Sequence, residues 1–229
     1  MAVQIIEYPN PNTIIPLRVA RGHFATNHSH INYYVDLTMT KYCLAEARNA
    51  AMELAGRFEH STIVDTILCL DGTEVIGACM ASELTRIGYR NMNANHDIYV
   101  VTPEHTVGSQ LIFRENISPM ITDKNVLILA ASVATGYTAQ EAVNVLRYYN
   151  GNPVGICSIF ARATECAGFP VTTIFDSSVL PDYQSVAAHE CPLCKAKVRL
   201  DAMVNTFGIS SFYAPLSETV GFWSAVSAD

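Results

Sequence analysis

The segment from Asn125 to Gly151, NVLILAASVATGYTAQEAVNVLRYYNG, constrains the fold of this chain most strongly. It begins as an apolar run typical of a buried strand, passes through small residues, and continues with the spacing of an amphipathic helix. Gly136 allows positive φ in the connecting turn, and Thr138 with Glu141 has the spacing of a capping box, which places Thr138 at or near the start of the helix. Backbone N–H groups gathered there would form an anion site. The alternative is an ordinary strand-to-helix turn.

The rest of the chain also alternates between strand and helix patterns. We expect strands at 62–70, 97–101, 126–130, 153–159 and 171–175, and helices at 42–58, 74–84, 139–149, 161–167 and near 202–206. Residues 102–123 are weakly patterned and predict a mobile loop or a β-hairpin. The alternation predicts an α/β fold, in which a mainly parallel twisted sheet carries helices on both faces.

The composition limits the domain count and the classes of partner. The length of 229 residues predicts a single domain over 1–229, with an irregular N-terminal arm or hood at 1–37, a core at 38–176 and a C-terminal extension or flap at 177–229. Half of the residues are hydrophobic and 15% are charged, which predicts a large core and a subunit interface. The net charge of -7 disfavours nucleic-acid binding.

Membrane and secreted classes are also disfavoured. No apolar run reaches the ~18 residues that a membrane-spanning helix needs. The first residues, MAVQIIEYPNPNT, lack the pattern of a secretory signal. We therefore expect a cytoplasmic protein with no membrane partner, in which most of the seven cysteines are buried thiols.

The Thr135-Gly136-Tyr137-Thr138 turn after an apolar strand resembles the phosphoribosyl-pyrophosphate signature of type I phosphoribosyltransferases. FATNHSHINYYVD at 24–36 resembles an early stretch of the orotate branch, and the turn at 71–73 stands where the family has its pyrophosphate loop. The resemblance covers about residues 20–176. It implies the family's fold, a homodimer, and transfer of a phosphoribosyl group between phosphoribosyl pyrophosphate and a base such as orotate.

The resemblance also implies a set of site residues. The 5′-phosphate would lie in the turn formed by Ser132, Ala134, Thr135, Gly136, Tyr137 and Thr138. Pyrophosphate would contact Asp71, Gly72 and Thr73, Arg114 would close from the mobile loop, and Tyr33 and Tyr34 would lie near the base. The alternatives are a plain turn at 71–73 and a tyrosine pair that occupies the two faces of a strand.

Two features depart from the family pattern. Ala130 and Ala131 replace an acidic pair that engages the ribose hydroxyls, directly or through magnesium. The loop has Arg114 beside Glu115 in place of a basic cluster. Asp71 and the nearby Glu74 could instead bring magnesium to a polyphosphate. Three interpretations stay open: an enzyme, a module that senses a nucleoside monophosphate or another phosphorylated metabolite, and a purely structural protein.

Cysteines and histidines suggest a metal site outside these motifs. Cys191 and Cys194 form a Cys-x-x-Cys knuckle, but zinc needs about four ligands. His189 is a candidate third ligand, and Cys157, Cys166 or a second copy of the chain could complete the set. The alternative is a pair of free thiols in a C-terminal flap. His23, His28 and His30 also cluster, and His28 and His30 would share a strand face, but with no third ligand in reach solvated or hydrogen-bonded histidines are favoured.

Overall fold

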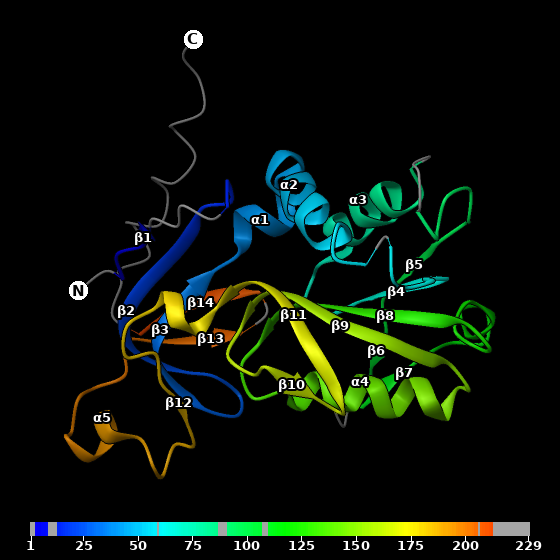
Figure 1. Cartoon of the computed structure of the whole chain (residues 1–229). Helices are drawn as coiled ribbons and strands as arrows, with labels where there is room; N and C mark the ends of the chain where they lie inside the picture. Colours follow the sequence, from blue (N-terminus) through cyan, green and yellow to red (C-terminus); the bar gives the residue numbers. More distant parts are fainter. Residues whose placement is uncertain are drawn as a thin grey trace. The chain divides into compact units, whose positions relative to one another are not determined.

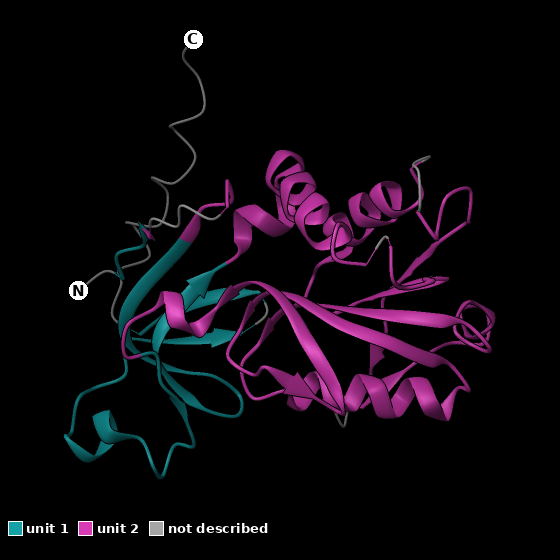
Figure 2. Ribbon diagram, in the orientation of Figure 1, with its two compact units in different colours: residues 1–7, 18–36, 183–229 teal, residues 8–17, 37–182 magenta. Residues whose placement is uncertain are grey.

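The computed structural model of the chain describes residues 3–8, 13–58, 60–86, 91–106, 110–205 and 207–212. It divides into two units, which Figure 2 distinguishes by colour. Unit 1 combines residues 1–7, 18–36 and 183–229, and unit 2 combines residues 8–17 and 37–182. Each unit has its own sheet, so the two ends of the chain contribute to one unit and the middle of the chain forms the other.

Unit 2 contains the parallel sheet that the sequence predicts. The strand order is β10-β11-β9-β8-β4-β5. The bounds are β4 Thr66–Cys69, β5 Tyr99–Val101, β8 Asn125–Val133, β9 Asn152–Ala161, β10 Glu165–Cys166 and β11 Phe169–Asp176. All neighbours pair in parallel except β10 and β11. Buried side chains along most of β8 and β9 explain why these two strands occupy the middle of the order.

Helices cover both faces of this sheet, as predicted. In Figure 1, α1, α2 and α3 lie on one side, and α4 lies on the other. Their bounds are Thr38–Tyr42, Leu44–Ala55, Glu74–Leu84 and Tyr137–Tyr148. The buried side chains of α4 are Ala139, Ala142, Val143 and Leu146, whose spacing produces one apolar stripe against the sheet. None of the helices in the described residues is long and apolar enough to cross a membrane.

The weakly patterned segment of unit 2 contains a short hairpin. β6 (Glu104–His105) pairs antiparallel with β7 (Leu111–Ile112), and a 3-10 helix follows at Ser118–Met120. Of the two structures predicted for residues 102–123, a mobile loop or a β-hairpin, the hairpin is present. Residues 107–109, between its strands, lie outside the described residues.

Unit 1 contains a second sheet, to which both the N-terminal and the C-terminal parts of the chain contribute. Its sheet has the order β12-β3-β2-β13-β14, with β1 paired to β2. The bounds are β1 Ile6–Tyr8, β2 Leu17–Ala25, β3 His30–Asp36, β12 Ser185–Val186, β13 Ala202–Asn205 and β14 Gly208–Ser211. A short 3-10 helix at Ser177–Val179 (unit 2) and the one-turn helix α5, Pro192–Lys195 (unit 1), lie between β11 and β13.

Two predicted helices are wrong. The helix expected near 202–206 is β13, whose residues alternate between buried and exposed because the strand pairs with β14 and β2. The helix expected at 161–167 is the end of β9 followed by β10. There, Ala167 and Gly168 both have positive φ, which produces a tight turn that returns the chain into β11.

Gly77 in α3 provides a test of how closely unit 2 is packed. A Cβ on Gly77 would overlap the Sγ of Cys69 and lie 3.2 Å from Cγ1 of Val100. The gain in helix propensity from Gly77→Ala is about 1 kcal/mol, whereas overpacking costs about 1–3 kcal/mol. We expect Gly77→Ala to lower the free energy of unfolding, measured by urea denaturation.

Gly56→Ala is the matched control. A Cβ on Gly56 would make only ordinary contacts, the nearest at 3.6 Å from the carbonyl oxygen of Met52. This substitution should leave stability unchanged or slightly higher. A Gly77→Ala variant as stable as Gly56→Ala would contradict the packing described for α3 against β4 and β5.

Candidate functional site

The turn after β8 contains the left-handed glycine that the sequence predicts. Gly136 has φ +80° and ψ -3° and is the N-cap residue of α4. The helix therefore begins at Tyr137, two residues before the predicted start, and Thr138 is its second residue. No side chain makes a capping hydrogen bond, so the capping box predicted between Thr138 and Glu141 does not form. Gly136, rather than Thr138, defines the start of the helix.

The backbone of this turn presents unsatisfied donors. Among the described residues, none accepts a hydrogen bond from the N–H groups of Ala134, Thr135, Gly136 or Thr138. The turn is open to solvent, because Thr135 is exposed and Gly136 and Thr138 are only partly buried. The N-terminus of α4 adds its partial positive charge at the same place. This arrangement is chemically suited to binding an anion such as a phosphate.

A second loop lies at the same edge of the sheet. β4 and β8 are parallel neighbours, with Cys69 opposite Leu129, so the loop at 71–73 follows β4 close to the end of β8. The hydroxyl of Thr73 donates to the carbonyl oxygens of Leu70, at 2.8 Å, and Leu129, at 3.1 Å. Asp71 and Gly72 have consecutive positive φ values of 59° and 78°. The buried Thr73 thus attaches this turn to β8.

Asp71 places a carboxylate beside the residues that replace the acidic pair. The backbone N–H of Ala131 lies close enough to this carboxylate to lower its pKa. Burial raises the pKa of Asp71 above its ordinary value, and this outweighs the opposite effects of Lys41, of the Ala131 N–H and of His105. An acidic group therefore reaches the end of β8 from the neighbouring loop.

Lys41 is a component of this site that sequence reasoning missed. Its Nζ donates to the backbone carbonyl of Asp71 at 3.0 Å, and the residue is only 5% exposed. A Cβ on Gly72 would lie 3.7 Å from this Nζ and 3.1 Å from the hydroxyl of Tyr42. Positive charge is thus held against the loop at 71–73. No local pattern marks Lys41, because the contact joins residues that are 30 positions apart.

Arg114 forms an exposed ion pair with Glu104 of the β6–β7 hairpin. Its Nε and Nη2 donate to one oxygen of Glu104 at 2.9 and 2.7 Å, and both side chains are exposed. This contact lowers the pKa of Glu104. The role of Arg114 as a residue that closes over a ligand stays a prediction.

Tyr33 and Tyr34 lie in β3 of unit 1, and both are buried. The ring of Tyr33 stacks on that of Tyr183, with 6.5 Å between centroids, and the guanidinium of Arg21 lies over it. The ring of Tyr34 packs against Phe24, and its hydroxyl donates to Asp36 at 3.4 Å. Both rings thus contribute to the packing of unit 1, and a position near a base stays a prediction.

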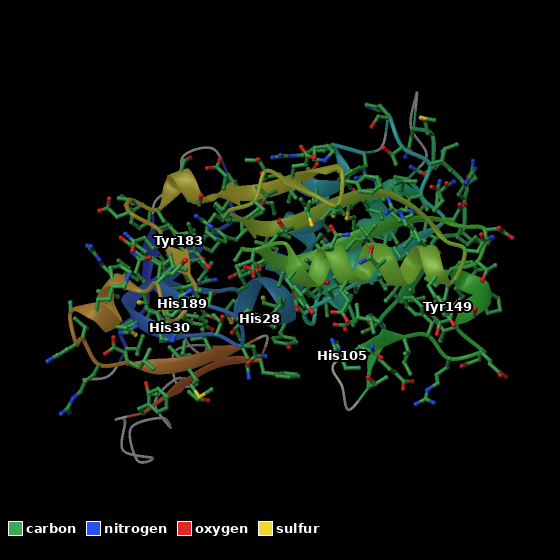
Figure 3. The ribbon with its side chains drawn as sticks, turned by 90° about the horizontal axis from the view of Figure 1, so that it is seen from below. His28, His30, His105, Tyr149, Tyr183 and His189 are labelled. Atoms are coloured by element: carbon green, nitrogen blue, oxygen red, sulfur yellow. The ribbon has the colours of Figure 1, made fainter. Side chains whose placement is uncertain are left out.

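The structure keeps Cys191 and Cys194 as candidate metal ligands but gives them different partners from those predicted. Cys191 and Cys194 lie together with His23 and His30, and not with His189, whose exposed ring lies 3.7 Å from Glu190. Figure 3 labels His28, His30 and His189 in this region. His28 lies in the loop between β2 and β3, so the prediction that it shares a strand face with His30 is wrong. The expectation that no third ligand lies in reach of the histidines is also wrong.

The other two cysteines considered as ligands lie in unit 2. Cys157 is fully buried in β9 and donates to the carbonyl oxygen of Ile128. Cys166 donates to the carbonyl oxygen of Gly136. Both thiols therefore have partners within the parallel-sheet unit, and Cys166 packs beneath the candidate phosphate turn.

Because the pKa of Asp71 is raised, we expect Asp71→Asn to increase the free energy of unfolding in a pH-dependent way. A carboxyl whose pKa is raised by desolvation is most favourable to folding below its unfolded pKa, near 3.8, and its contribution is lost as the pH rises through the folded value. The amide stays neutral at all pH values. Asp71→Asn should therefore raise the free energy of unfolding at pH 7, and the difference should disappear as the pH falls below 3.8.

Asp97→Asn, at an exposed position, is the control and should give no such difference. The measurement is urea unfolding at several pH values for the wild type and both variants. A destabilised Asp71→Asn variant at pH 7 would contradict the electrostatic account of this loop.

Comparison with known proteins gives partial sequence similarity. No family model matches the chain. An orotate phosphoribosyltransferase from Thermoanaerobacter sp. (strain X514) is 34% identical over 77 residues, which are 34% of this chain and 40% of the relative. The transcriptional regulator GfcR from Methanocorpusculum labreanum is 39% identical over 75 residues, which are 32% of this chain and 36% of that protein. The matched region thus spans about two fifths of the length of these relatives.

Solved structures have a similar fold. UMP synthase from Leishmania donovani gives a TM-score of 0.52 at 17% identity, over 79% of this chain and 36% of that chain. Mycobacterium tuberculosis orotate phosphoribosyltransferase in complex with phosphoribosyl diphosphate gives 0.45 at 18% identity, over 64% and 82%. Adenine phosphoribosyltransferase from Trypanosoma brucei gives 0.48 at 13% identity, over 80% and 90%. The predicted resemblance is confirmed: this chain has a phosphoribosyltransferase-type fold, and part of its sequence is similar to an orotate phosphoribosyltransferase.

Proposed function

We propose that this protein transfers a phosphoribosyl group between phosphoribosyl pyrophosphate and a nitrogenous base, with orotate or a similar pyrimidine as the first candidate. The observation that carries the proposal is the turn after β8, where N–H groups at a helix start have no acceptor among the described residues. A group that develops or carries negative charge is stabilised by such preorganised donors.

The 5′-phosphate would be bound by the backbone N–H groups of Ala134, Thr135, Gly136 and Thr138. The hydroxyls of Ser132, Thr135 and Thr138 would be further donors. Pyrophosphate would lie at the loop of Asp71, Gly72 and Thr73, where Lys41 supplies a buried positive charge. The reaction breaks the bond between the sugar and pyrophosphate and forms a bond to the base. Lys41 would stabilise the negative charge that collects on the departing pyrophosphate.

The site fits magnesium, but with fewer carboxylate ligands than the family pattern provides. Ala130 and Ala131 offer no side-chain oxygen ligand, but the Asp71 carboxylate lies near the N–H of Ala131 and would substitute for the missing carboxylates. Magnesium is commonly held by one or two carboxylates together with substrate phosphates, so a single carboxylate here is compatible with it. Bound there, magnesium would neutralise the charge of the pyrophosphate group.

The proposed reaction also suggests a cellular role and a location for the protein. A role in nucleotide metabolism, and in pyrimidine biosynthesis if orotate is the base, would place the protein in the cytoplasm. We expect a subunit interface, because little charge is available to cover the surface of a monomer, and the family resemblance implies a homodimer.

A second candidate function is that of a sensor that binds a nucleoside monophosphate without turning it over. The methyl groups of Ala130 and Ala131 favour it, since they can neither accept a hydrogen bond from ribose hydroxyls nor hold a cation. One protein with partial similarity is named a transcriptional regulator. Both candidates use the same phosphate turn and differ in whether a bond is broken.

A pyrophosphate-release assay separates the two candidates. The protein is incubated with phosphoribosyl pyrophosphate, magnesium and a panel of bases. Release of pyrophosphate with at least one base is the expected result. If the missing carboxylates limit the reaction, Ala130→Glu with Ala131→Asp should raise the affinity for phosphoribosyl pyrophosphate. Nucleotide binding without pyrophosphate release from any base would favour the sensor, and the transferase proposal would be abandoned.

Calorimetry with nucleoside monophosphates tests the phosphate turn under either candidate. Loss of one hydroxyl donor is worth about 0.5–1.5 kcal/mol, so Thr135→Ala and Thr138→Ala should each weaken binding about two- to tenfold. Gln140→Ala is the control, because Gln140 is exposed on the first turn of the same helix and donates to Asn144. If neither a monophosphate nor inorganic phosphate bound at millimolar concentration, both candidates would fail.

A further inference from the structure

Four metal-binding side chains converge in unit 1 from separate parts of the chain. His23 lies in β2, His30 begins β3, Cys191 is the N-cap residue of α5, and Cys194 lies within α5. One ligand atom from each residue lies within 4.8 Å of all the others. His23 and Cys191 are separated by 168 positions. The cluster therefore forms only when the segment 18–36 and the segment that begins at residue 183 fold together into unit 1.

The distances within the cluster match a tetrahedral zinc site. With zinc–nitrogen bonds of about 2.0–2.1 Å and zinc–sulfur bonds of about 2.3 Å, a tetrahedron separates two nitrogens by about 3.3 Å and a nitrogen from a sulfur by about 3.6 Å. Nε2 of His23 lies 3.1 Å from Nδ1 of His30, 3.5 Å from Sγ of Cys191 and 3.7 Å from Sγ of Cys194. Sγ of Cys194 lies 3.3 Å from Nδ1 of His30.

The ring of His23 is held in the orientation that a metal ligand needs. Its Nδ1 lies 3.0 Å from the carbonyl oxygen of Val198, to which an Nδ1–H can donate. That hydrogen bond leaves the lone pair of Nε2 directed at the other three ligand atoms. Metal-binding histidines in proteins almost always make such a bond with the second ring nitrogen. The 1% exposure of His23 further restricts the ring.

The segment around the two cysteines has little other means of attachment. Between Ala187 and Leu200, Cys191 is the only buried residue, and Val198 is 47% exposed. The cysteines lie on a tight knuckle, in which the N–H of Lys195 donates to the carbonyl of Cys191 and that of Lys197 to the carbonyl of Cys194. A chain segment without an apolar core is commonly stabilised by a metal.

We propose that His23, His30, Cys191 and Cys194 bind one structural zinc ion that fastens the segment 187–200 to the β2–β3 hairpin. Two thiolates and two imidazoles are a ligand set that zinc favours, and four protein ligands leave no position for a substrate or a water. The site is therefore closed, and its function is to stabilise the fold of unit 1 rather than to catalyse a reaction.

The test measures the metal content of the purified full-length chain by mass spectrometry after incubation with zinc and removal of the excess. About one zinc ion per chain is expected for the wild type. Cys194→Ser and His30→Ala should each lose most of this zinc, because three protein ligands hold it less well. The matched controls Cys43→Ser and His28→Ala alter a thiol outside the cluster and a histidine two residues from His30, and both should keep it.

X-ray absorption on the wild type keeps the proposal falsifiable if the variants do not fold. Two sulfur neighbours at about 2.3 Å and two nitrogen neighbours at about 2.0–2.1 Å are expected. A wild-type chain that retains no zinc, a Cys194→Ser variant that retains as much as the wild type, or a spectrum without sulfur neighbours would each overturn the proposal.

Discussion

The left-handed conformation of Gly136 is the constraint on which the candidate site depends. A side chain at this position would be strained at φ +80°, and its Cβ would lie 3.1 Å from Sγ of Cys166. The glycine lies between the end of β8 and the start of α4, which has no capping side chain. The N–H groups of Ala134, Thr135, Gly136 and Thr138 therefore stay open to a ligand. An ordinary capped turn would have used some of these donors internally, and the anion site would be smaller.

The parallel pairing of β4 with β8 then determines what lies next to that turn. The loops after both strands emerge at one edge of the sheet, and the buried hydroxyl of Thr73 connects the loop at 71–73 to β8. This proximity brings the carboxylate of Asp71 to Ala131 and the ammonium of Lys41 to the backbone of Asp71. The chain lacks an acidic pair on β8, yet the carboxylate of Asp71 and the ammonium of Lys41 lie at the loop beside β8, supplied by neighbouring elements.

Local patterns predicted the elements that carry their signal within one segment. The strand β8, the glycine turn, α3 and α4 were predicted because apolar periodicity and Gly136 are visible in a short window. The start of α4 was misplaced, since the capping-box spacing of Thr138 suggested a cap that Gly136 provides instead. β13 was predicted as a helix because its pairing with β2 and β14 is not a local property. Contacts between distant residues, such as Lys41 with the Asp71 carbonyl and His23 with the cysteines, left no mark in the sequence pattern.

The central claim is that main-chain N–H groups at the start of α4 bind a phosphoryl group. Nuclear magnetic resonance of the ¹⁵N-labelled protein, titrated with inorganic phosphate against a chloride control, observes those groups one by one. The account predicts that the amide resonances of Thr135, Gly136 and Thr138 shift together and saturate with a single dissociation constant, while amides at the amino ends of β8 and β9 do not move. Amides of the turn that are unaffected at saturating phosphate would contradict it.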